Sequence, residues 1–441
     1  MLDIKFIRQN KDAVKQSITD RGMNVDIDGL LGLDEKRRAL IGKIEEGRAV
    51  RNRKSRPKRG SSTEGGAVEG KPSLEEIEKM RVLGDEIART EKELKELEVY
   101  YSELLKKVPN MIHADTPRGG DENFRVIEEH GDITKFYAKD GSASGGDFEP
   151  KDHESLMLAL DLVDFERGAK VTGTKFYFAK NDLVRLSQAL LNYGIDIVTK
   201  HDYILMETPD LAKDSILSGI GFNPRGPETQ VYSIENSNLS LIGTAEITLG
   251  GYHADEILDL SKGPKKYVAL SHCFRTEAGS YGRESKGLYR VHQFTKLEMF
   301  VYCKPEDSEK IHKEILDIEK EIVNNLELSY RVIDTASEDL GAPAYRKFDI
   351  EAWLPTKNQP VGGYGEITST SNCTDYQARR LGIKYRKNNS ESEYVHTLNG
   401  TAVVSSRLPM AIFENYQTAK GTVVIPKVLQ KYMGGIKEIG K

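Results

Sequence analysis

The sequence predicts an α+β protein in which helices flank an antiparallel sheet and an antiparallel α-helical coiled-coil arm forms the N-terminal part. Before about Pro109, apolar residues recur at intervals of three and four within a dense pattern of charges. After residue 150, strands occur in runs with helices grouped between them. Neither G-x-G-x-x-G nor G-x-x-x-x-G-K-[ST] occurs, so the sequence offers no glycine-rich phosphate cradle.

The composition excludes several classes of protein. Of 441 residues, 38% are hydrophobic and 30% are charged, which indicates a water-soluble protein of two or three domains. No apolar run is long enough to span a bilayer, and we expect no membrane partner. The net charge of −5 gives no global positive field, so DNA is not expected and any nucleic-acid contact must come from a local patch.

The cysteines and the N-terminal residues indicate the cellular compartment in which the protein is expected. Cys273, Cys303 and Cys373 show no C-x-x-C spacing and cannot all pair, which favours a reducing compartment and argues against a cysteine zinc site. The first residues do not resemble a signal peptide. Organellar import sequences contain few acidic residues, so Asp3 near the start argues against one. A cytoplasmic location is therefore expected, with an organelle as the alternative.

The arm is predicted as one short and two long helices. Apolar residues between positions 4 and 18 indicate a short amphipathic helix that ends near Gly22. Apolar residues at helical spacing then extend over residues 30–44 and 77–108. The high charge and the narrow apolar stripe of the long helices favour a two-stranded antiparallel coiled coil in solvent over an ordinary pair of core helices.

The second long helix carries explicit boundary signals. Ser73 is a predicted N-cap, and Glu76 three residues later completes a capping box. Pro109 is expected to stop the helix because proline lacks the backbone N–H that the helix needs.

Residues 48–59 form a basic cluster in an otherwise acidic chain. A flexible tip, G-S-S-T-E-G-G-A-V-E-G, follows it, so the cluster is expected near the end of the arm. Such a run is either a solvated helix end or a surface that contacts a phosphate backbone, and the arm is alternatively a protein–protein coiled coil. The residues predicted to contact RNA are Arg48, Arg51, Arg53, Lys54, Arg56, Lys58 and Arg59.

Three domains follow from these patterns: an arm at residues 1–112, a linker leading into the core at 113–150, and a main domain at 151–441. The main domain is expected to begin with a helix at residues 152–165 and a strand at 174–180. A helix capped by Asp182 is expected to end at Gly194. Another helix is expected at 305–326.

Residues 273–300 are predicted to form a long hairpin. Arg275 and Glu277 are placed on one strand and Phe294 and Glu298 on the other, with the glycine-punctuated turn at 279–287 expected to move. An arginine held in a fixed position can bind two phosphate oxygens at once, so this hairpin suits a polyphosphate substrate. The alternative is a solvated hairpin with surface ion pairs.

Three further segments carry polar residues in a pattern that suits a site. L-I-G-T-A-E-I places Thr244 and Glu246 together, and an alternating strand contains Glu366. L-N-G-T-A-V-V-S-S-R-L runs from a strand into a helix with Arg407 at the junction. Each alone is equally compatible with half-buried hydroxyls in strands and with a capping or surface arginine.

Together these segments resemble class II aminoacyl-tRNA synthetases. C-F-R-T-E-A-G looks like motif two of that class, and N-G-T-A-V-V-S-S-R-L looks like motif three. G-L-Y-R-V-H-Q-F-T-K-L-E-M, G-T-A-E and E-I-T-S-T-S-N-C-T-D-Y-Q-A-R-R narrow the resemblance to the seryl-tRNA synthetase family. The coiled-coil pattern and the ending V-V-I-P-K-V-L-Q-K-Y-M-G-G fit the same family, so the resemblance covers essentially the whole chain.

The resemblance implies a serine–tRNA ligase. L-serine would react in line with ATP to give seryl-adenylate and pyrophosphate, and the terminal ribose hydroxyl of serine tRNA would then take the seryl group. Selenocysteine tRNA is an additional candidate substrate. No covalent enzyme nucleophile is expected, so catalysis would depend on positioning and charge stabilisation.

The resemblance also implies roles for residues around ATP. Arg275 and Arg407 would be catalytic: Arg275 would bind the α-phosphate and the serine carboxylate, and Arg407 the γ-phosphate. Glu277 would read the adenine amino group while Phe294 stacks on the ring. The other residues expected around ATP are Thr276, Arg290, Val291, Glu366, Ile367, Thr368 and Ser369.

By the same resemblance, a serine pocket and a metal site adjoin ATP. The residues expected around serine are Thr244, Ala245, Glu246, Glu298 and Thr401. Such a pocket rejects alanine because loss of the hydroxyl leaves buried polar groups unpaired. Glu366 and Ser369 would hold Mg²⁺ between phosphates. Which glutamate takes the ammonium and which the hydroxyl stays open.

A homodimer is also implied, because M-E-T-P-D-L at residues 206–211 is similar to the family's motif one. Motif three departs from the family, since Ala402 and Ser406 stand where glycines are usual, and this variant resembles organellar forms. Two rival readings are a paralogue that loads a carrier protein and a non-catalytic RNA-binding protein on a synthetase scaffold. The basic arm argues against the first, and the presence of Arg275, Glu366 and Arg407 argues against the second.

Overall fold

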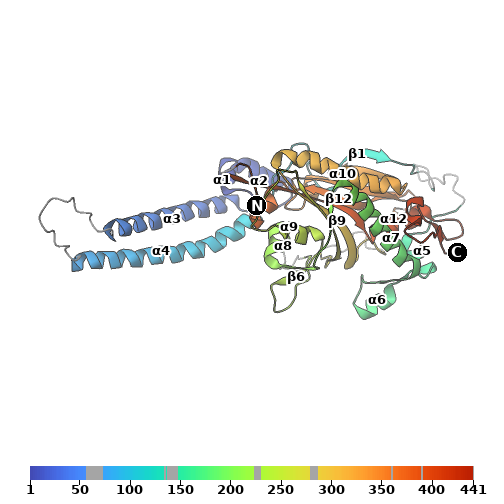
Figure 1. Cartoon of the computed structure of the whole chain (residues 1–441), viewed down its shortest axis with the longest axis horizontal. Coiled ribbons are helices and arrows are strands. Elements are labelled where there is room, and N and C mark those ends of the chain that lie inside the picture. Colours follow the sequence, from blue (N-terminus) through green and yellow to red (C-terminus); the bar gives the residue numbers. More distant parts are fainter. Residues whose placement is uncertain are drawn as a thin grey trace. The chain divides into compact units, whose positions relative to one another are not determined.

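The computed structural model describes residues 1–55, 73–133, 136, 148–222, 230–278, 287–358, 361–388 and 391–440. The chain divides into two compact units, which Figure 1 shows together with the labelled elements. One unit consists of Leu2–Thr19 and Met23–Pro109, and the other of Met1, Asp20–Gly22 and Asn110–Lys441. The first unit is helical, and a β-sheet organises the second.

The helical unit contains α1 (Ile4–Gln9), α2 (Lys11–Asp20), α3 (Ile27–Ser55) and α4 (Leu74–Lys107). The prediction of one helix over residues 4–18 was wrong, because the backbone of Asn10 leaves the helical region and its N–H caps α1 at the carbonyl of Phe6. The predicted capping box of α4 is present. Ser73 Oγ accepts from Glu76 N at 3.1 Å, and Glu76 Oε2 accepts from Ser73 N at 2.9 Å.

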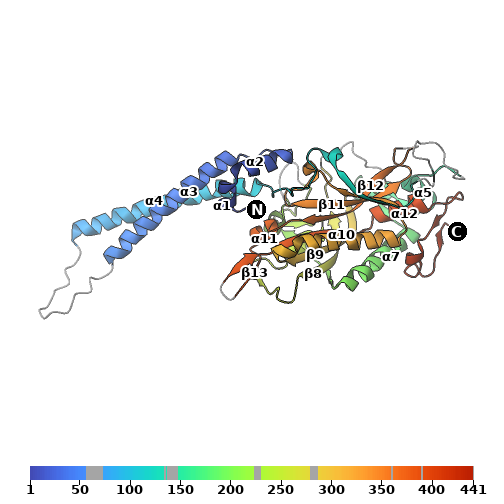
Figure 2. The ribbon, with the colours of Figure 1, turned by 90° about the horizontal axis from the view of Figure 1, so that it is seen from above.

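The long helices α3 and α4 run antiparallel and side by side in both Figure 1 and Figure 2, as the coiled-coil prediction requires. Their buried apolar residues form a narrow stripe that includes Leu40, Ile44 and Ile87. Partly exposed ion pairs connect the two helices beside this stripe, at Arg37–Glu98 and Arg48–Glu91. The stripe provides the packing free energy, and the charges keep the outer faces in water.

Among the described residues, the central sheet has eight strands. In spatial order they are β1 (Arg125–His130), β10 (Tyr330–Asp334), β11 (Arg346–Leu354), β12 (Gly363–Asn372), β15 (His396–Val404), β9 (Gln293–Cys303), β8 (Lys265–Phe274) and β4 (Ile204–Glu207). Neighbouring strands are antiparallel except β4 and β8, which are parallel. The predicted antiparallel α+β class is confirmed, and β1 adds a strand from the segment expected to be a linker.

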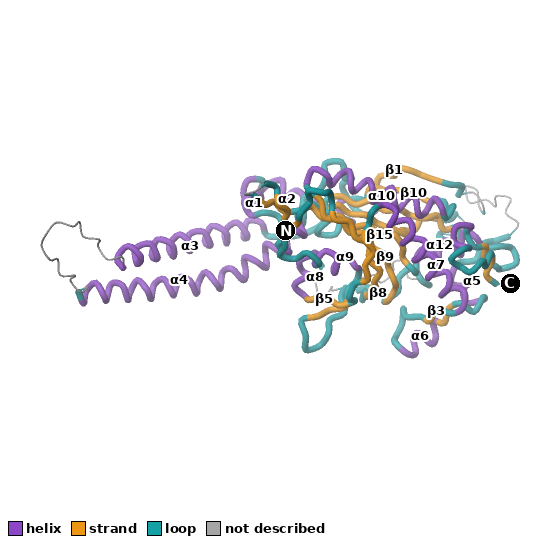
Figure 3. The backbone as a smooth tube through the Cα atoms, viewed as in Figure 1, coloured by secondary structure: helices purple, strands orange, loops and turns teal. Residues whose placement is uncertain are grey.

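The remaining helices and short strands surround this sheet, shown as orange strands among purple helices in Figure 3. The helices are α5 (His153–Ala159), α6 (Phe165–Val171), α7 (Asn181–Val198), α8 (Asp214–Ile220), α9 (Ala245–Gly251), α10 (Ser308–Asn325), α11 (Tyr376–Leu381), α12 (Arg407–Tyr416), α13 (Lys427–Gln430) and the 3-10 turns η1 (Asp121–Asn123), η2 (Thr199–His201), η3 (Pro305–Asp307) and η4 (Ser337–Asp339). The short strands are β2 (Val163–Asp164), β3 (Phe178–Ala179), β5 (Leu211–Lys213), β6 (Leu239–Leu241), β7 (Ile257–Leu258), β13 (Lys384–Arg386), β14 (Ser392–Tyr394), β16 (Val423–Val424) and β17 (Glu438–Ile439).

Strand β9 lies inside the sheet, between β15 and β8, and is buried on both faces. Met299 and Val301 belong to a core cluster with residues of α7, α10 and α12. Phe300 and Tyr302 alternate with them and pack with residues of α8, α9 and α11 on the opposite face. Burial on both faces fixes the register of β9, and therefore fixes the polar side chains near the start of the strand.

Three local predictions in the main domain were wrong. The helix from Asp152 ends at Ala159, and the strand predicted at 174–180 is limited to β3. Helix α7 continues through Gly194 to Val198. Gly194 is required for packing rather than termination, because a Cβ there would lie 2.6 Å from Cγ2 of Val403.

None of the helices in the described ranges is long and apolar enough to span a bilayer.

Candidate active site

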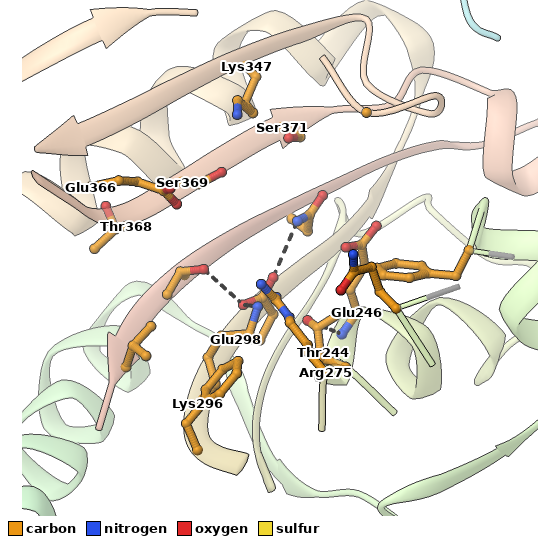
Figure 4. Close-up of a pocket in the computed structure, with 18 of the residues that line it drawn as sticks. Thr244, Glu246, Arg275, Lys296, Glu298, Lys347, Glu366, Thr368, Ser369 and Ser371 are labelled. Carbon is orange, nitrogen blue, oxygen red and sulfur yellow. Dashed lines mark hydrogen bonds and ion pairs between the residues drawn. The ribbon is translucent and has the colours of Figure 1, made fainter. Parts of the chain in front are cut away.

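A cavity of about 600 Å³ lies in the sheet-containing unit and collects most of the predicted site residues (Figure 4). The predicted residues that line it are Thr244, Glu246, Arg275, Glu277, Arg290, Val291, Phe294, Glu298, Glu366, Ile367, Thr368, Ser369, Thr401 and Arg407. The predicted residues Ala245 and Thr276 are adjacent in sequence but do not line it. Segments far apart in the chain therefore converge on one site.

The hairpin that carries motif two is present, with β8 and β9 paired from Lys265–Tyr302 to Phe274–Gln293. The placement of Arg275 and Glu277 on the strand was wrong, because β8 ends at Phe274. Thr276 N donates to the carbonyl of Gln230 at 3.1 Å, which draws the chain away from β9. The turn predicted to move lies outside the described residues, apart from its last residue, Gly287.

Arg275 is held against an aromatic ring at the edge of the cavity. Its guanidinium lies 5.2 Å from the ring centroid of Phe294, and its Nε donates to the carbonyl of Gly243 at 3.2 Å. A cation fixed in this way offers positive charge at a defined place without a large loss of side-chain freedom on binding a ligand.

Glu277 adopts an unusual backbone conformation beside Arg275. Its φ of +49° lies in the left-handed region, which a residue with a Cβ visits at a cost of about 1 kcal/mol. Its Oε2 lies 3.3 Å from Nη1 of Arg290, and Arg290 Nε is buried without a hydrogen-bond partner among the described residues. This conformation orients the Glu277 carboxylate while Arg290 holds it.

Glu298 is the most deeply placed carboxylate of the cavity. It is fully buried, and its Oε2 lies 2.5 Å from Nζ of Lys296. Thr401 Oγ1 and Asn399 Nδ2 each donate to this carboxylate at 3.2 Å. Thr401 lies opposite Glu298 in the register of β15 and β9, and the two-residue period of each strand brings in Lys296 and Asn399.

Glu246 lies at the start of α9, where Thr244 is the N-cap. Thr244 Oγ1 accepts from Glu246 N at 3.1 Å, and Gln377 Nε2 donates to Glu246 Oε1 at 2.7 Å. Burial and the nearby charge of Glu298 raise the pKa of Glu246 to about 7. This carboxyl group therefore changes its charge near neutral pH.

The opposite end of the cavity contains Glu366 of β12 and Arg407 of α12. Arg407 Nη1 lies 2.9 Å from Glu366 Oε1 and donates to the backbone carbonyl of Glu366 at 3.1 Å. The Arg407 guanidinium also lies 5.1 Å from the ring centroid of Tyr289, whose hydroxyl accepts from Glu366 N at 3.1 Å. Although burial opposes it, Arg407 and then Lys347 hold the pKa of Glu366 well below its ordinary value.

The donors near Glu366 suit a magnesium ion. Arg407 and Lys347 keep Glu366 ionised. Ser369 follows on the same strand after the register shift between Glu366 and Thr368, and a carboxylate and a hydroxyl oxygen both line the cavity. Asp349 faces Ser369 across the pairing of β11 and β12, and its Oδ1 is buried without a hydrogen-bond partner in the described residues. No group of three or more His, Cys, Asp or Glu residues capable of holding a metal occurs in the part of the chain that is described. Two protein oxygens fit Mg²⁺, which takes its other ligands from phosphates and water.

Sequence reasoning missed Lys296, Asn399 and Lys347 as lining residues. Lys347 Nζ lies 2.7 Å from Asp339 and 3.3 Å from Asp349, and these carboxylates raise its pKa although burial opposes them. The two-residue period of the strands could have identified Lys296 and Asn399 once Glu298 and Thr401 were chosen. For Lys347 the sequence offers no comparable signal.

The motif-three substitutions lie in different environments. Ala402 is fully buried in the core, at an irregularity in the pairing of β15 with β9, and so its methyl group does not line the cavity. Ser406 lines the cavity as the residue before α12. The arginine at the junction, Arg407, is the first residue of that helix, as predicted.

The predicted RNA-contacting residues are only partly described. Arg48, Arg51 and Arg53 are exposed on α3. The side chain of Lys54 and the residues Arg56, Lys58 and Arg59 lie outside the described part of the chain.

Comparisons with known proteins agree with this geometry. The profile "Seryl-tRNA synthetase N-terminal domain" matches residues 1–112, and "tRNA synthetase class II core domain (G, H, P, S and T)" matches residues 230–416. A serine–tRNA ligase of Treponema denticola is 49% identical over 98% of this chain and 99% of its own length. One from Dictyoglomus turgidum is 49% identical over 100% of this chain and 99% of its own.

Solved structures give the same result. Seryl-tRNA synthetase from Pyrococcus horikoshii, complexed with ATP, has a TM-score of 0.88 and 37% identity over 100% of this chain and 99% of that chain. Cytoplasmic serine–tRNA ligase from Naegleria fowleri, in complex with AMP, has a TM-score of 0.86 and 32% identity over 100% and 98%. With its coiled-coil arm, its class II sheet and these full-length relatives, the chain belongs to the seryl-tRNA synthetase family.

Proposed function

We propose that this chain activates L-serine with ATP, forming seryl-adenylate and pyrophosphate, and transfers the seryl group to the 3′-terminal ribose of serine tRNA. One observation carries the proposal. A single cavity holds two buried carboxylates, Glu246 and Glu298, together with the cations Arg275 and Arg407. The carboxylates suit the ammonium and hydroxyl of serine, and the cations suit phosphates and a carboxylate. The ATP-bound and AMP-bound relatives support a nucleotide as co-substrate.

The chemistry we propose needs no enzyme nucleophile. Cys373 lines the cavity, but burial, and then the charge of Glu246, raise the pKa of its thiol, so it remains protonated. The serine carboxylate would attack the α-phosphate directly while the protein fixes both reactants and stabilises the developing charge.

We assign the ATP contacts as follows. Arg275 binds the α-phosphate and the serine carboxylate, Arg407 binds the γ-phosphate, Glu277 accepts from the adenine amino group, and Phe294 stacks on the ring. These four residues line the same cavity, and the contacts that hold Glu277 and Arg407 fix their charges there, which supports these assignments. Arg290, Val291, Ile367 and Thr368 complete the surroundings of ATP, and Thr276 connects Arg275 to Glu277 without lining the cavity.

Glu366 and Ser369 would hold Mg²⁺ between phosphates of ATP. When bound, the ion would offset the negative charge that develops on the leaving pyrophosphate. The protein's own part is to keep Glu366 ionised through Arg407 and Lys347.

Thr244, Glu246, Glu298 and Thr401 form the proposed serine pocket, and Ala245 connects the first two of them without lining the cavity. Lys296 partly neutralises Glu298, and Thr401 and Asn399 orient it. Alanine would leave these buried groups without a hydroxyl partner, so selectivity against alanine is expected to be strong.

For tRNA, we propose that residues 1–112 are the binding arm, 113–150 connect it to the core, and 151–441 are catalytic. The basic residues of the arm would contact the phosphate backbone of serine tRNA, and selenocysteine tRNA is a second candidate. The profile match to residues 1–112 supports the arm assignment.

We further propose a cytoplasmic homodimer. Strand β4 is at the edge of the described sheet, where Ile204 and Leu205 expose apolar side chains, and Leu211 of β5 is exposed as well. An exposed apolar edge suits a second copy of the chain. Sedimentation at micromolar concentration should give twice the mass of one chain, and a single-chain mass would contradict the dimer.

Serine-dependent ATP–pyrophosphate exchange tests the activation step. Exchange should occur with serine and be much weaker with threonine and alanine. Active, folded protein that gives no exchange with serine would refute the proposal. Exchange with serine but loading of a carrier protein instead of tRNA would identify a paralogue of different function.

A further inference from the structure

The residues that follow η4 form one wall of the cavity. Residues 340–344, L-G-A-P-A, are called the wall loop, and Gly341, Ala342, Pro343 and Ala344 all line the cavity. A Cβ built on Gly221, another lining residue, would lie 3.3 Å from Pro343, so the loop closely faces the chain on the other side. The position of this loop therefore sets the width of the cavity.

The wall loop has no polar side chain and depends on other residues for its conformation. Each of its five consecutive carbonyls accepts a hydrogen bond from Arg21 or Asn110. The bonds run from Arg21 to Leu340 O at 3.3 Å, Gly341 O at 3.0 Å and Ala344 O at 2.7 Å, and from Asn110 to Ala342 O at 2.9 Å and Pro343 O at 2.9 Å. Two residues thus hold the whole backbone of the loop.

Arg21 lies between α2 and α3 in the sequence and is only 4% exposed. It also donates to Met111 O at 3.0 Å, in the segment that follows α4. The planar guanidinium presents donors in a rigid fork, which allows one side chain to hold several carbonyls. Burial lowers its pKa to about 10, because carbonyl oxygens do not neutralise the charge as a carboxylate would.

Asn110 extends the contact to the serine end of the cavity. Its Nδ2 also donates to the carbonyl of Cys373 at 2.9 Å and to Thr374 Oγ1 at 3.0 Å. Gln377 Nε2 donates both to Glu246 Oε1 at 2.7 Å and to the carbonyl of Ile220 at 3.2 Å, and the next residue, Gly221, is the one that faces Pro343 of the wall loop. The wall loop and the proposed serine carboxylate Glu246 therefore border the same end of the cavity.

We propose that Arg21 and Asn110 are positioning residues for serine recognition: by fixing the wall loop, they set the width of the serine pocket. The inference rests on the proposed function, because it assigns a role within that same serine pocket. It extends the site to two residues that flank the coiled-coil helices in sequence and touch neither substrate.

The test compares exchange kinetics of Arg21→Met, Arg21→Lys and Asn110→Ala with those of the wild type. Arg118→Met is the matched control, since Arg118 holds the same short segment through Asp20 at 3.0 Å but donates to Thr116 and His113 instead of the wall loop. Arg21→Met should raise KM for serine about tenfold or more and leave KM for ATP within about twofold. The relative rate with threonine should rise, because a looser wall admits an extra methyl group.

Arg21→Lys keeps a buried cation but not the fork, so its serine KM should be intermediate. Arg118→Met should leave both KM values within about twofold. Folded Arg21→Met with unchanged serine KM, or with equal rises in both KM values, would overturn the inference. If Arg21→Met fails to fold, Asn110→Ala and Arg21→Lys decide in the same way. Absence of serine-dependent exchange in the wild type would instead refute the proposed function.

Discussion

An ion pair of the arm and one of the cavity each join a basic side chain to a glutamate at a similar distance, but in very different surroundings. Arg48 and Glu91 of the arm are 2.7 Å apart with side chains 55% and 41% exposed. Lys296 and Glu298 of the cavity are 2.5 Å apart with side chains 7% and 1% exposed. Water screens the first pair and not the second, so burial decides what each pair does.

This difference separates two kinds of function. An exposed pair contributes roughly 0–1 kcal/mol, so an arm residue can exchange its carboxylate for a phosphate at little cost in stability. A buried pair cannot lose one member without leaving an unpaired charge. The arm can therefore tolerate changes of partner, while the cavity holds one arrangement that a substrate must match.

The largest expected effect comes from removing the distal arm. Replacement of residues 49–90 by a short glycine linker joins Arg48 to Glu91, which already lie side by side. Serine-dependent exchange should stay within about twofold, whereas charging of serine tRNA should fall by at least about a thousandfold because the phosphate contacts are lost. Equal loss of both activities would show that the arm only stabilises the fold.

Next, Lys296→Met should destabilise the fold by about 3–5 kcal/mol, because Glu298 would be left buried without its cation. Urea unfolding measures this change. The double variant Lys296→Met with Glu298→Gln should recover much of the loss, since no buried charge remains. A single variant as stable as the wild type would mean that Glu298 is already neutral.

Arg407→Ala should reduce kcat/KM of exchange about a hundredfold to a thousandfold, a loss of about 2.7–4 kcal/mol of transition-state stabilisation. It removes the contacts to Glu366 and to Tyr289. Arg118→Met, whose side chain lies outside the cavity, is the control. If Arg407→Ala retains full activity, the proposed phosphate contact is wrong.

The titration of Glu246 gives a smaller effect. Its pKa is raised to about 7 in the folded protein, so the folded state holds a proton that the unfolded state releases near its ordinary pKa of 4.5. This group therefore lowers stability as pH rises from about 4.5 to about 7. If ionised Glu246 binds the serine ammonium, KM for serine should fall about tenfold between about pH 6 and about pH 8. In Glu246→Gln this fall should disappear, and a persistent fall would exclude Glu246 as its source.

The smallest effect is expected for the exposed ion pair of the arm. Arg48→Ala should change the free energy of unfolding by less than about 0.5 kcal/mol, because its pair with Glu91 is exposed. It should nevertheless weaken tRNA binding. The slope of the logarithm of the binding constant against the logarithm of the salt concentration should become shallower by about one, as expected for the loss of one phosphate contact. Binding measured over a series of salt concentrations distinguishes the two effects. A large loss of stability would contradict the conclusion that exposed ion pairs of the arm contribute little to the free energy of unfolding.

The sequence predicted most reliably what depends on neighbouring residues. The capping box at Ser73 and the stop before Pro109 are local, and both were confirmed. The antiparallel pairing of α3 with α4 was also predictable, because two apolar stripes of similar length joined by a glycine-rich and serine-rich segment have few other ways to be buried. The motif residues reached one cavity because their chemistry was recognisable in short runs.

Features that depend on contacts between distant segments were not predictable. The end of β8 at Phe274 follows from a bond to Gln230, more than forty positions earlier in the chain. Gly194 lies inside α7 because Val403 packs against it. Lys347 reaches the cavity only through the position of β11 in the sheet. Local patterns contain none of this information.

The left-handed backbone of Glu277 has a consequence for evolution and engineering. A glycine would adopt φ of +49° without steric cost, so replacing Glu277 would relieve about 1 kcal/mol of backbone strain. The same replacement would break the ion pair between Glu277 and Arg290, whose Nε is already buried without a hydrogen-bond partner among the described residues. A glutamate at this position therefore exchanges about 1 kcal/mol of backbone strain for a carboxylate held in one place, and libraries screened only by melting temperature would not select for the role of that carboxylate in binding.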